Sequence, residues 1–260
     1  MADLAALLVR ADAHGSLPRL GGMARADGVV IASDRYWAFA RTDGSIREGV
    51  MPRPPERLSR LPLLRGLVRL FSAMAPLFRG TGVARRYERP LLAAAMLIPF
   101  GFVFLPHRDG TVAGILVTLA LLAWLFRGRT RSLHGAEHRA IAAVEERRLV
   151  ATWGGAARPT RFARRCGTNF AALVLPVAAL GDAVVPVPGA FLGTVLVAVL
   201  SLAFTMELWR AVQSSERRLA RLLLMPGLVL QRLTTAEPRL NETHVALLAT
   251  ASVLRRELAD

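Results

Sequence analysis

The sequence predicts a mainly α-helical integral membrane protein with about four transmembrane helices, a small N-terminal β-hairpin element and cytoplasmic helices. The first observation is composition, because 53% of the 260 residues are hydrophobic while the formal net charge is +15. The second is that apolar residues gather in four segments, and the third is that the arginines lie almost entirely outside these segments. Together the three observations are typical of a membrane protein with basic cytoplasmic parts.

Residues 1–58 are predicted to form a cytoplasmic region that contains the β-hairpin. Hydrophobic and polar residues alternate on both sides of Asp43-Gly44, a dipeptide that favours a tight hairpin turn. We expect strands near Gly28–Ser33, Tyr36–Arg41 and Ser45–Met51. The proline-rich stretch PRPPER then ends this region, because proline cannot donate a ladder hydrogen bond.

Residues 59–89 are predicted to form an amphipathic helix at the membrane surface. The apolar run from Leu61 to Phe71 is interrupted at helical spacing by Arg65 and Arg69. A helix of this kind can lie in the membrane interface with its arginines facing lipid headgroups. The alternative is a helix that covers the β-hairpin.

Two transmembrane hairpins are predicted, over residues 90–126 and 170–209. A spanning helix needs about 20 apolar residues, and only the last segment reaches that length comfortably. The first two segments are shorter and fit best as a tight hairpin, while the third carries Asp182 near its end. The alternative is a soluble all-helical core. The four segments are Pro90–Leu105, Thr111–Phe126, Phe170–Val185 and Gly189–Trp209.

The arginines predict the orientation. Apart from Arg108, they lie in residues 1–90, 127–169 and the C-terminal region 210–260. By the positive-inside rule these regions and both termini are cytoplasmic. The expected partners are the lipid bilayer and its anionic lipids at the cytoplasmic face, with a membrane protein as a further possibility. Nucleic acid is not expected, because aromatic residues are sparse among the arginines and membrane orientation explains the charge.

The cytoplasmic loop and helix at 127–169 contain the motif HGAEH. Ser132 can cap a helix that runs to about Arg148, and His134 and His138 then share one helix face. Neutral imidazoles at this spacing can clamp a metal ion, and His-x-x-Glu-His is also the reversed zinc-peptidase pattern, with Glu137 as general base. The alternative is a polar helix face that caps the spans and binds no metal.

Three further residues are candidate metal ligands. Glu145 falls on the same helix face as His134, about three turns later. Cys166 could supply a thiolate favoured by the arginines around it, or be a small buried residue in a turn. Glu207 sits near the inner end of the last span, where a carboxylate is either functional or paired, for example with Arg210.

The chain resembles the YqhQ-like bacterial membrane proteins, a family of unknown function often described as predicted metal-dependent enzymes. The matching pieces are GG, DGSI, LPLLRG, HGAEHRAI, RCGTNF and PGLVLQRLTTAEP, in family order over most of the chain. The resemblance implies a multi-pass protein of the inner (plasma) membrane with a site facing the cytoplasm, and implies no known reaction. The chain departs from the family where a histidine usually precedes Arg-Cys-Gly, since Ala163 or Arg164 stands there.

Two classes of function follow. In the first, the protein is a metal-dependent hydrolase in which His134 and His138 hold Zn²⁺ or a similar divalent ion, Glu137 is the base, and Glu207 or Glu145 completes the site. In the second, it is a non-catalytic accessory or scaffold protein that docks a membrane protein complex. There the His-Glu-His cluster only holds the cytoplasmic cap in place.

Overall fold

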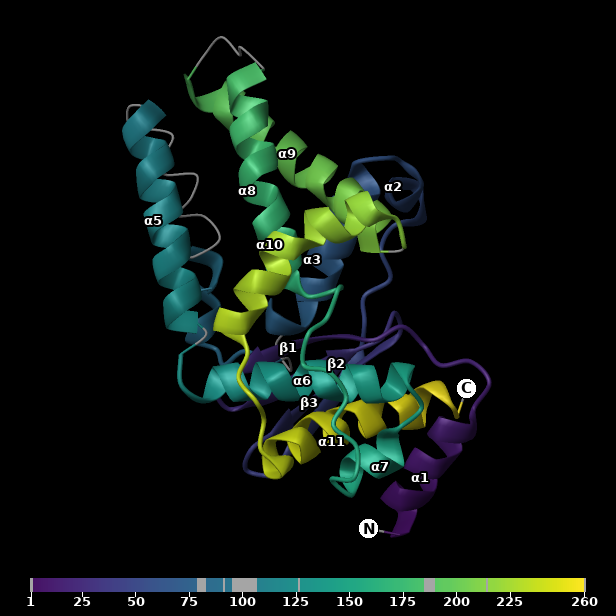
Figure 1. Cartoon of the computed structure of the whole chain (residues 1–260). Helices are drawn as coiled ribbons and strands as arrows, with labels where there is room; N and C mark the ends of the chain where they lie inside the picture. Colours follow the sequence, from purple (N-terminus) through teal and green to yellow (C-terminus); the bar gives the residue numbers. More distant parts are fainter. Residues whose placement is uncertain are drawn as a thin grey trace.

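The strands lie close to the N-terminus and form one antiparallel sheet in the order β1-β2-β3-β4. The computed structural model describes residues 2–78, 83–90, 92–94, 107–125, 127–184, 190–213 and 215–259. The prediction of a mainly helical chain with a small N-terminal β element is confirmed (Figure 1). The strands are β1 (Gly21–Arg25), β2 (Gly28–Ala32), β3 (Tyr36–Arg41) and β4 (Ile46–Val50).

The sheet has one strand more than the sequence interpretation placed. Strands β2, β3 and β4 fall where they were expected, whereas β1 was missed. Arg25 pairs with Gly28, so only Ala26 and Asp27 connect β1 to β2. The turn is thus two residues long, and Gly28 already belongs to β2.

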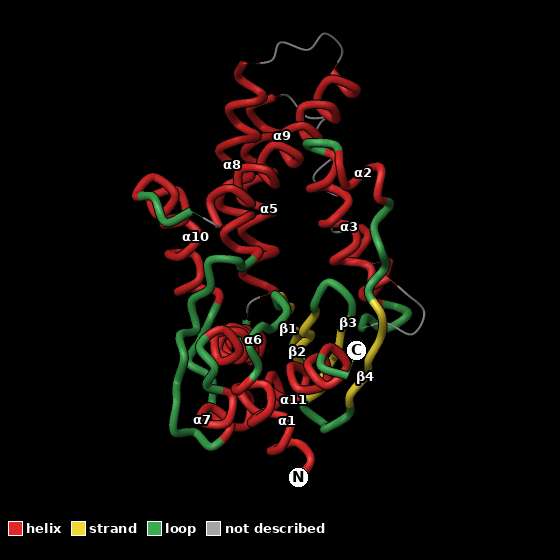
Figure 2. Tube along the Cα trace, turned by 90° about the vertical axis from the view of Figure 1, so that its right-hand side faces the viewer, coloured by secondary structure: helices red, strands yellow, loops and turns green. Residues whose placement is uncertain are grey.

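Helices α6 (Arg129–Glu145) and α11 (Leu240–Glu257) cover one face of the sheet. Val29 and Ile31 of the sheet belong to the same buried core as Leu133 and Leu247 of these two helices. The short α7 (Leu149–Trp153) and the N-terminal α1 (Ala2–Ala13) complete this body. Figure 2 shows α6 and α11 nearly end-on beside the strands. We call α1, the four strands, α6, α7 and α11 the sheet region.

The other face of the sheet meets the first part of the helical chain. After the short α2 (Glu56–Arg60), α3 (Leu64–Phe78) brings Leu77 against Trp37 and Phe39. Arg65 of α3 forms a two-point ion pair with Glu207, with Nε–Oε1 at 2.7 Å. The guanidinium of Arg65 is thus paired with a carboxylate on α9, and the prediction that Arg65 and Arg69 face lipid headgroups stays a prediction.

Four helices extend away from the sheet region, and we call them the helical region (Figure 1). They are α5 (His107–Leu125), α8 (Gly167–Val184), α9 (Ala190–Gln213) and α10 (Arg218–Thr234). Helix α8 packs against both α9 and α10. The sequence predicts that the helix of the last apolar segment continues over Arg210 to Met225 and ends at Pro226-Gly227. Instead α9 ends at Gln213, and the separate α10 runs through both Pro226 and Gly227.

The predicted spans have different outcomes. The first, Pro90–Leu105, lies outside the described residues except for 90 and 92–94, whereas the other three coincide with α5, α8 and α9. Within the described ranges, one stretch, Val195–Gln213, is long and apolar enough to cross a membrane, with a mean hydropathy of 1.8. Only 22% of that stretch is buried inside the protein.

Candidate metal centre

Helix α6 carries the HGAEH motif and is enclosed by the protein on several sides. His134, Glu137 and His138 are 4%, 5% and 2% exposed. Two glycines allow the surrounding chain to come this close. A Cβ on Gly22 of β1 would lie 2.8 Å from Cγ of Glu137, and one on Gly135 would lie 2.2 Å from the carbonyl oxygen of Ala236. A side chain at either position would push its neighbour away.

Each imidazole of the motif is held by a backbone carbonyl. His134 Nδ1 lies 3.0 Å from the carbonyl oxygen of Thr234, and His138 Nδ1 lies 2.7 Å from that of Arg161. A carbonyl oxygen only accepts hydrogen bonds, so Nδ1 carries the proton in both rings. The lone pair of each Nε2 is therefore left for another group, which is the arrangement found around metal-binding histidines.

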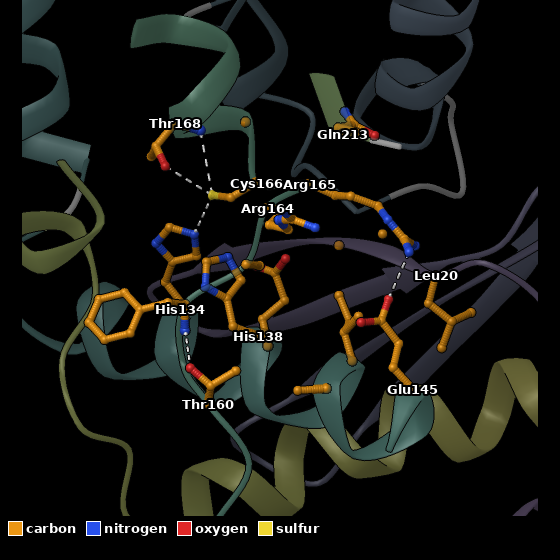
Figure 3. A pocket seen from close by; sticks show the side chains of 18 of the residues that line it. Leu20, His134, His138, Glu145, Thr160, Arg164, Arg165, Cys166, Thr168 and Gln213 are labelled. Atoms are coloured by element: carbon orange, nitrogen blue, oxygen red, sulfur yellow. Dashed lines mark hydrogen bonds and ion pairs between the residues drawn. The ribbon is translucent and has the colours of Figure 1, made fainter. Parts of the chain in front are cut away.

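The third member of the cluster is Cys166, which stands just before α8. Its sulfur lies 3.3 Å from Nε2 of His134. Figure 3 shows both imidazoles rising from α6 toward this sulfur. The metal-binding atoms of His134, His138 and Cys166 all lie within 4.8 Å of one another. Nε2 of His138 is buried and has no hydrogen-bond partner among the described residues.

Burial decides the charge state of the cluster. It lowers the pKa of His134, and it lowers the pKa of His138 to about 3, with the charge of His134 as a second cause. Both rings are therefore neutral near pH 7, which is the form that binds a metal.

Cys166 is a protonated thiol in the metal-free protein. Burial, followed by the nearby charge of Glu137, raises its pKa to about 12. Of the two interpretations of Cys166, the metal-free structure therefore fits the small buried residue rather than a thiolate stabilised by arginines. Two hydrogen bonds from Thr168 would nevertheless stabilise a thiolate. Its hydroxyl donates to the sulfur at 3.1 Å, and its backbone N–H donates at 3.4 Å. A bound cation would displace the thiol proton.

Glu137 lies beside this cluster and is 5% exposed. Burial raises its pKa to about 8, and within the described part of the chain no hydrogen bond to the carboxyl contributes to this shift. The carboxylate faces a pocket of about 660 Å³, which it lines together with His134, His138 and Cys166. β1, α6, the chain before α8 and the residues after α9 form its walls.

Glu145 and Glu207 lie outside the cluster. Glu145 lines the pocket, but it is half exposed and pairs with Arg165 at 3.2 Å (Figure 3). Glu207 does not line the pocket and pairs with Arg65. The structure therefore brings together His134, His138, Cys166 and Glu137, and leaves the two other carboxylates with arginine partners.

Two arginines join the loops that supply the carbonyls. Arg139 is 6% exposed and donates to the carbonyl oxygen of Pro159 and to the carboxylate of Glu237. Arg161 donates to the carbonyl oxygen of Thr235 at 3.0 Å. These bonds tie the loop before α8 to the loop after α10, so both carbonyls are held over α6.

Sequence reasoning missed the residues that support the cluster. Gly22 belongs to the GG pair quoted for the family resemblance, but a glycine pair does not tell which distant side chain it will face. Thr168 stands two residues after Cys166 and has no signature of its own. The carbonyls of Thr234 and Arg161 leave no signal in a sequence, because every residue has one.

Comparison with known proteins agrees with the motif-based resemblance. Residues 112–256, which contain the whole cluster, match a family described as "Protein of unknown function (DUF1385)". The curated protein "Uncharacterized protein YqhQ" of Bacillus subtilis (strain 168) is 23% identical over 304 aligned residues, covering 94% of this chain and 95% of that protein. No solved structure matches the chain. The family match spans more than half of the sequence, and the chain is therefore a member of the DUF1385 family, to which no function has been assigned.

Proposed function

We propose that this protein is a membrane-bound, metal-dependent hydrolase in which His134, His138 and Cys166 hold a divalent cation and Glu137 is the general base. The observation that carries the proposal is the convergence of two imidazoles, whose tautomers are set by carbonyls, and one thiol within 4.8 Å. The carboxylate of Glu137 shares their pocket.

The donor set fits Zn²⁺ best. Two nitrogens and one sulfur suit a borderline-soft ion, whereas Mg²⁺ and Ca²⁺ prefer oxygen. Nε2 of His138 is buried and has no hydrogen-bond partner among the described residues, which costs free energy unless another group binds the nitrogen. This supports a cation at this position. Three protein ligands with a fourth position open is the pattern of catalytic rather than structural zinc. When bound, the ion would lower the pKa of a water molecule toward about 7.

Glu137 suits the role of proton acceptor. It follows His134 by three residues and precedes His138 by one, so its side chain flanks the face that carries both ligands. Among the described residues it has no arginine partner, in contrast to Glu145 and Glu207. Its pKa of about 8 keeps the carboxyl mostly protonated near pH 7 in the metal-free protein, and a bound cation would favour the ionised form that accepts a proton.

The proposed location is the inner membrane, with both termini and the metal centre on the cytoplasmic side. Large apolar side chains are exposed on every helix of the helical region, among them Leu116 of α5, Leu180 of α8 and Phe204 of α9. Lipid is the solvent that such a surface requires. The charged sheet region would then lie in the cytoplasm, near anionic headgroups.

A second candidate is a non-catalytic scaffold, which the same hydrogen bonds support in another way. The bonds from His134 and His138 to two loops also fasten those loops to α6, and Arg139 reinforces them. A cap held in this way could dock a membrane protein complex without any chemistry.

One set of variants separates the two candidates. Metal content is measured on purified protein, and function by complementation of a deletion strain at equal membrane abundance. We expect His134→Ala and His138→Ala to lose both metal and function, and Glu137→Gln to keep the metal and lose function, because Gln matches Glu in size but cannot accept the proton.

The matched control is Glu145→Gln, two turns later on the same helix and in the same pocket. It should keep both metal and function, because Glu145 lies outside the ligand cluster. Full function from a stable Glu137→Gln protein would exclude the hydrolase and leave the scaffold.

A further inference from the structure

Helix α10 presents an unbroken apolar row to the outside. Its exposed face carries five large apolar side chains, each more than half exposed: Leu219, Leu222, Met225, Val229 and Leu233. The opposite face is buried and carries Ala220, Leu224, Gly227, Gln231 and Thr234. At 100° per residue these two sets fall on opposite sides of the helix.

The charges carried by α10 itself have one sign, because the helix contains arginines but no acidic residue. Arg221 and Arg232 fall at the same edge of the apolar row, about three turns apart, and Arg218 lies at the N-terminal end of the row. Arg221 also forms an exposed ion pair with Glu216, just before the helix, at 3.2 Å. An apolar face bordered by arginines is the pattern of a helix that lies in the plane of a membrane, where cations meet headgroup phosphates.

The buried face of α10 supports the metal centre. Gln231 donates to the carbonyl oxygen of Ala163 at 2.8 Å and accepts from the N–H of the same residue at 2.9 Å. It also donates to Asn169 at 3.1 Å. At the end of the helix, the carbonyl oxygen of Thr234 accepts a hydrogen bond from Nδ1–H of His134. Helix α10 therefore has an outward apolar face and an inward face that holds the loop at Ala163 and the imidazole of His134.

We propose that α10 docks in the plane of an anionic bilayer and by this docking holds Thr234 and Gln231 against the metal centre. The inference rests on the proposed membrane location. Lipid is the occupant that the surroundings favour, because α10 packs on α8 and α9, whose own apolar side chains are exposed, and because α9 is long enough to span. Figures 1 and 2 place α10 beside α8, at the level where the helical region meets the sheet region.

Docking is tested with spin labels on the full chain in vesicles of phosphatidylcholine and phosphatidylglycerol. Labels are attached at Leu222→Cys and Val229→Cys, with Val150→Cys of α7 as an exposed control in the sheet region. Wild type controls for Cys166, whose burial should prevent labelling. We expect labels at 222 and 229 to collide with oxygen more than with a water-soluble chromium complex, and the label at 150 to show the reverse.

Two results would overturn lipid docking. Labels at 222 and 229 that are as accessible to the chromium complex as the label at 150 would place α10 in water. Labels shielded from both reagents, with broadening between copies, would place a second copy of the chain on the row instead.

The link to the metal centre is tested by cobalt titration in the same vesicles. Leu222→Glu/Val229→Glu should bind Co²⁺ more weakly than wild type and lose intensity in the thiolate-to-cobalt absorption, whereas Val150→Glu should match wild type. Equal binding by the double variant and wild type would overturn the link. Wild type that binds no cobalt would overturn the metal centre together with the link, while the collision data still decide docking.

Discussion

Helices α6 and α9 have opposite relations between composition and burial. α6 is rich in arginine, histidine and glutamate, yet twelve of its seventeen residues are buried. α9 is almost entirely apolar, yet Leu196, Leu200 and Phe204 are all exposed. In these two helices, therefore, the buried fraction does not follow the hydropathy of the residues. The sheet region encloses polar groups because they form a site, whereas the helical region exposes apolar groups because, as we propose, lipid covers them.

The largest expected effect is the pH dependence of stability that the buried Glu137 of α6 causes. The pKa of Glu137 in the folded protein is about 8, against an ordinary value of 4.5. The folded state therefore binds more protons than the unfolded state between these values, so stability is full at low pH and falls as pH rises through the folded pKa. At about pH 9 the ionised group costs roughly 3–5 kcal/mol, at 1.36 kcal/mol per pKa unit.

Thermal unfolding of metal-free protein in detergent checks this expectation. Glu137→Gln should melt above wild type at about pH 9 and lose that advantage by about pH 5. Glu145→Gln, which removes a half-exposed partner of Arg165, should follow wild type within about 1 kcal/mol at both values. Parallel curves for wild type and Glu137→Gln would mean that the buried carboxylate keeps its ordinary pKa.

The second effect tests the exposed apolar surface of α9. Leu200 and Val9 are both exposed, at 45% and 56%, but they lie in the helical and sheet regions respectively. An arginine at the centre of a spanning helix costs about 2.5–3.5 kcal/mol of insertion free energy, whereas most exposed positions in water tolerate substitution within about 0.5 kcal/mol.

We therefore expect Leu200→Arg to lower the amount of protein that stays in membranes after alkaline extraction, and Val9→Arg to leave it unchanged. Equal retention of the two variants would remove the contrast between the regions, because both exposed surfaces would then face water.

The smallest expected effect is the loss of stability when a side chain is added at Gly22, where β1 packs against α6. A Cβ at Gly22 would lie 2.7 Å from the carbonyl oxygen of Val30 and 2.8 Å from Glu137, whereas nothing lies within 4 Å of one at Gly21. Gly22→Ala should cost about 1–3 kcal/mol in overpacking. Gly21→Ala should be neutral or slightly stabilising, because alanine reduces the entropy of the unfolded chain. Urea unfolding measures the free energy of unfolding of both variants, at two adjacent glycines that differ in the space available for a Cβ.

The sequence predicted the parts of this molecule that depend on local pattern. The i, i+4 spacing of His134 and His138 is a helical property, and the pairing of β3 with β4 follows from a short turn. Cys166 was a candidate ligand because arginines surround it in the sequence.

The parts that depend on distant chain segments were not predicted. Glu207 was assigned to a metal site or to Arg210. The charge of Arg210 does act on Glu207, but the hydrogen-bonded partner is Arg65, which lies 142 residues earlier. The separation of α9 from α10 was also missed, because an arginine-rich helix after a span continues the same periodicity. The sequence left Cys166 open between a thiolate favoured by arginines and a small buried residue, because the pKa of a thiol depends on what surrounds it in space.

The separation of the site's parts along the chain sets the order in which a cell can make it. Helix α6 leaves the ribosome early, but Thr234, whose carbonyl orients His134, follows 100 residues later. Helix α11, which buries the other side of α6, follows α10 in the chain. A nascent chain that has reached only α9 therefore holds His134, His138 and Cys166 without the framework that orients them. In the proposed function a cation would load only after α10 and α11 have been made, and chains cut short before α10 would reach proteases without it.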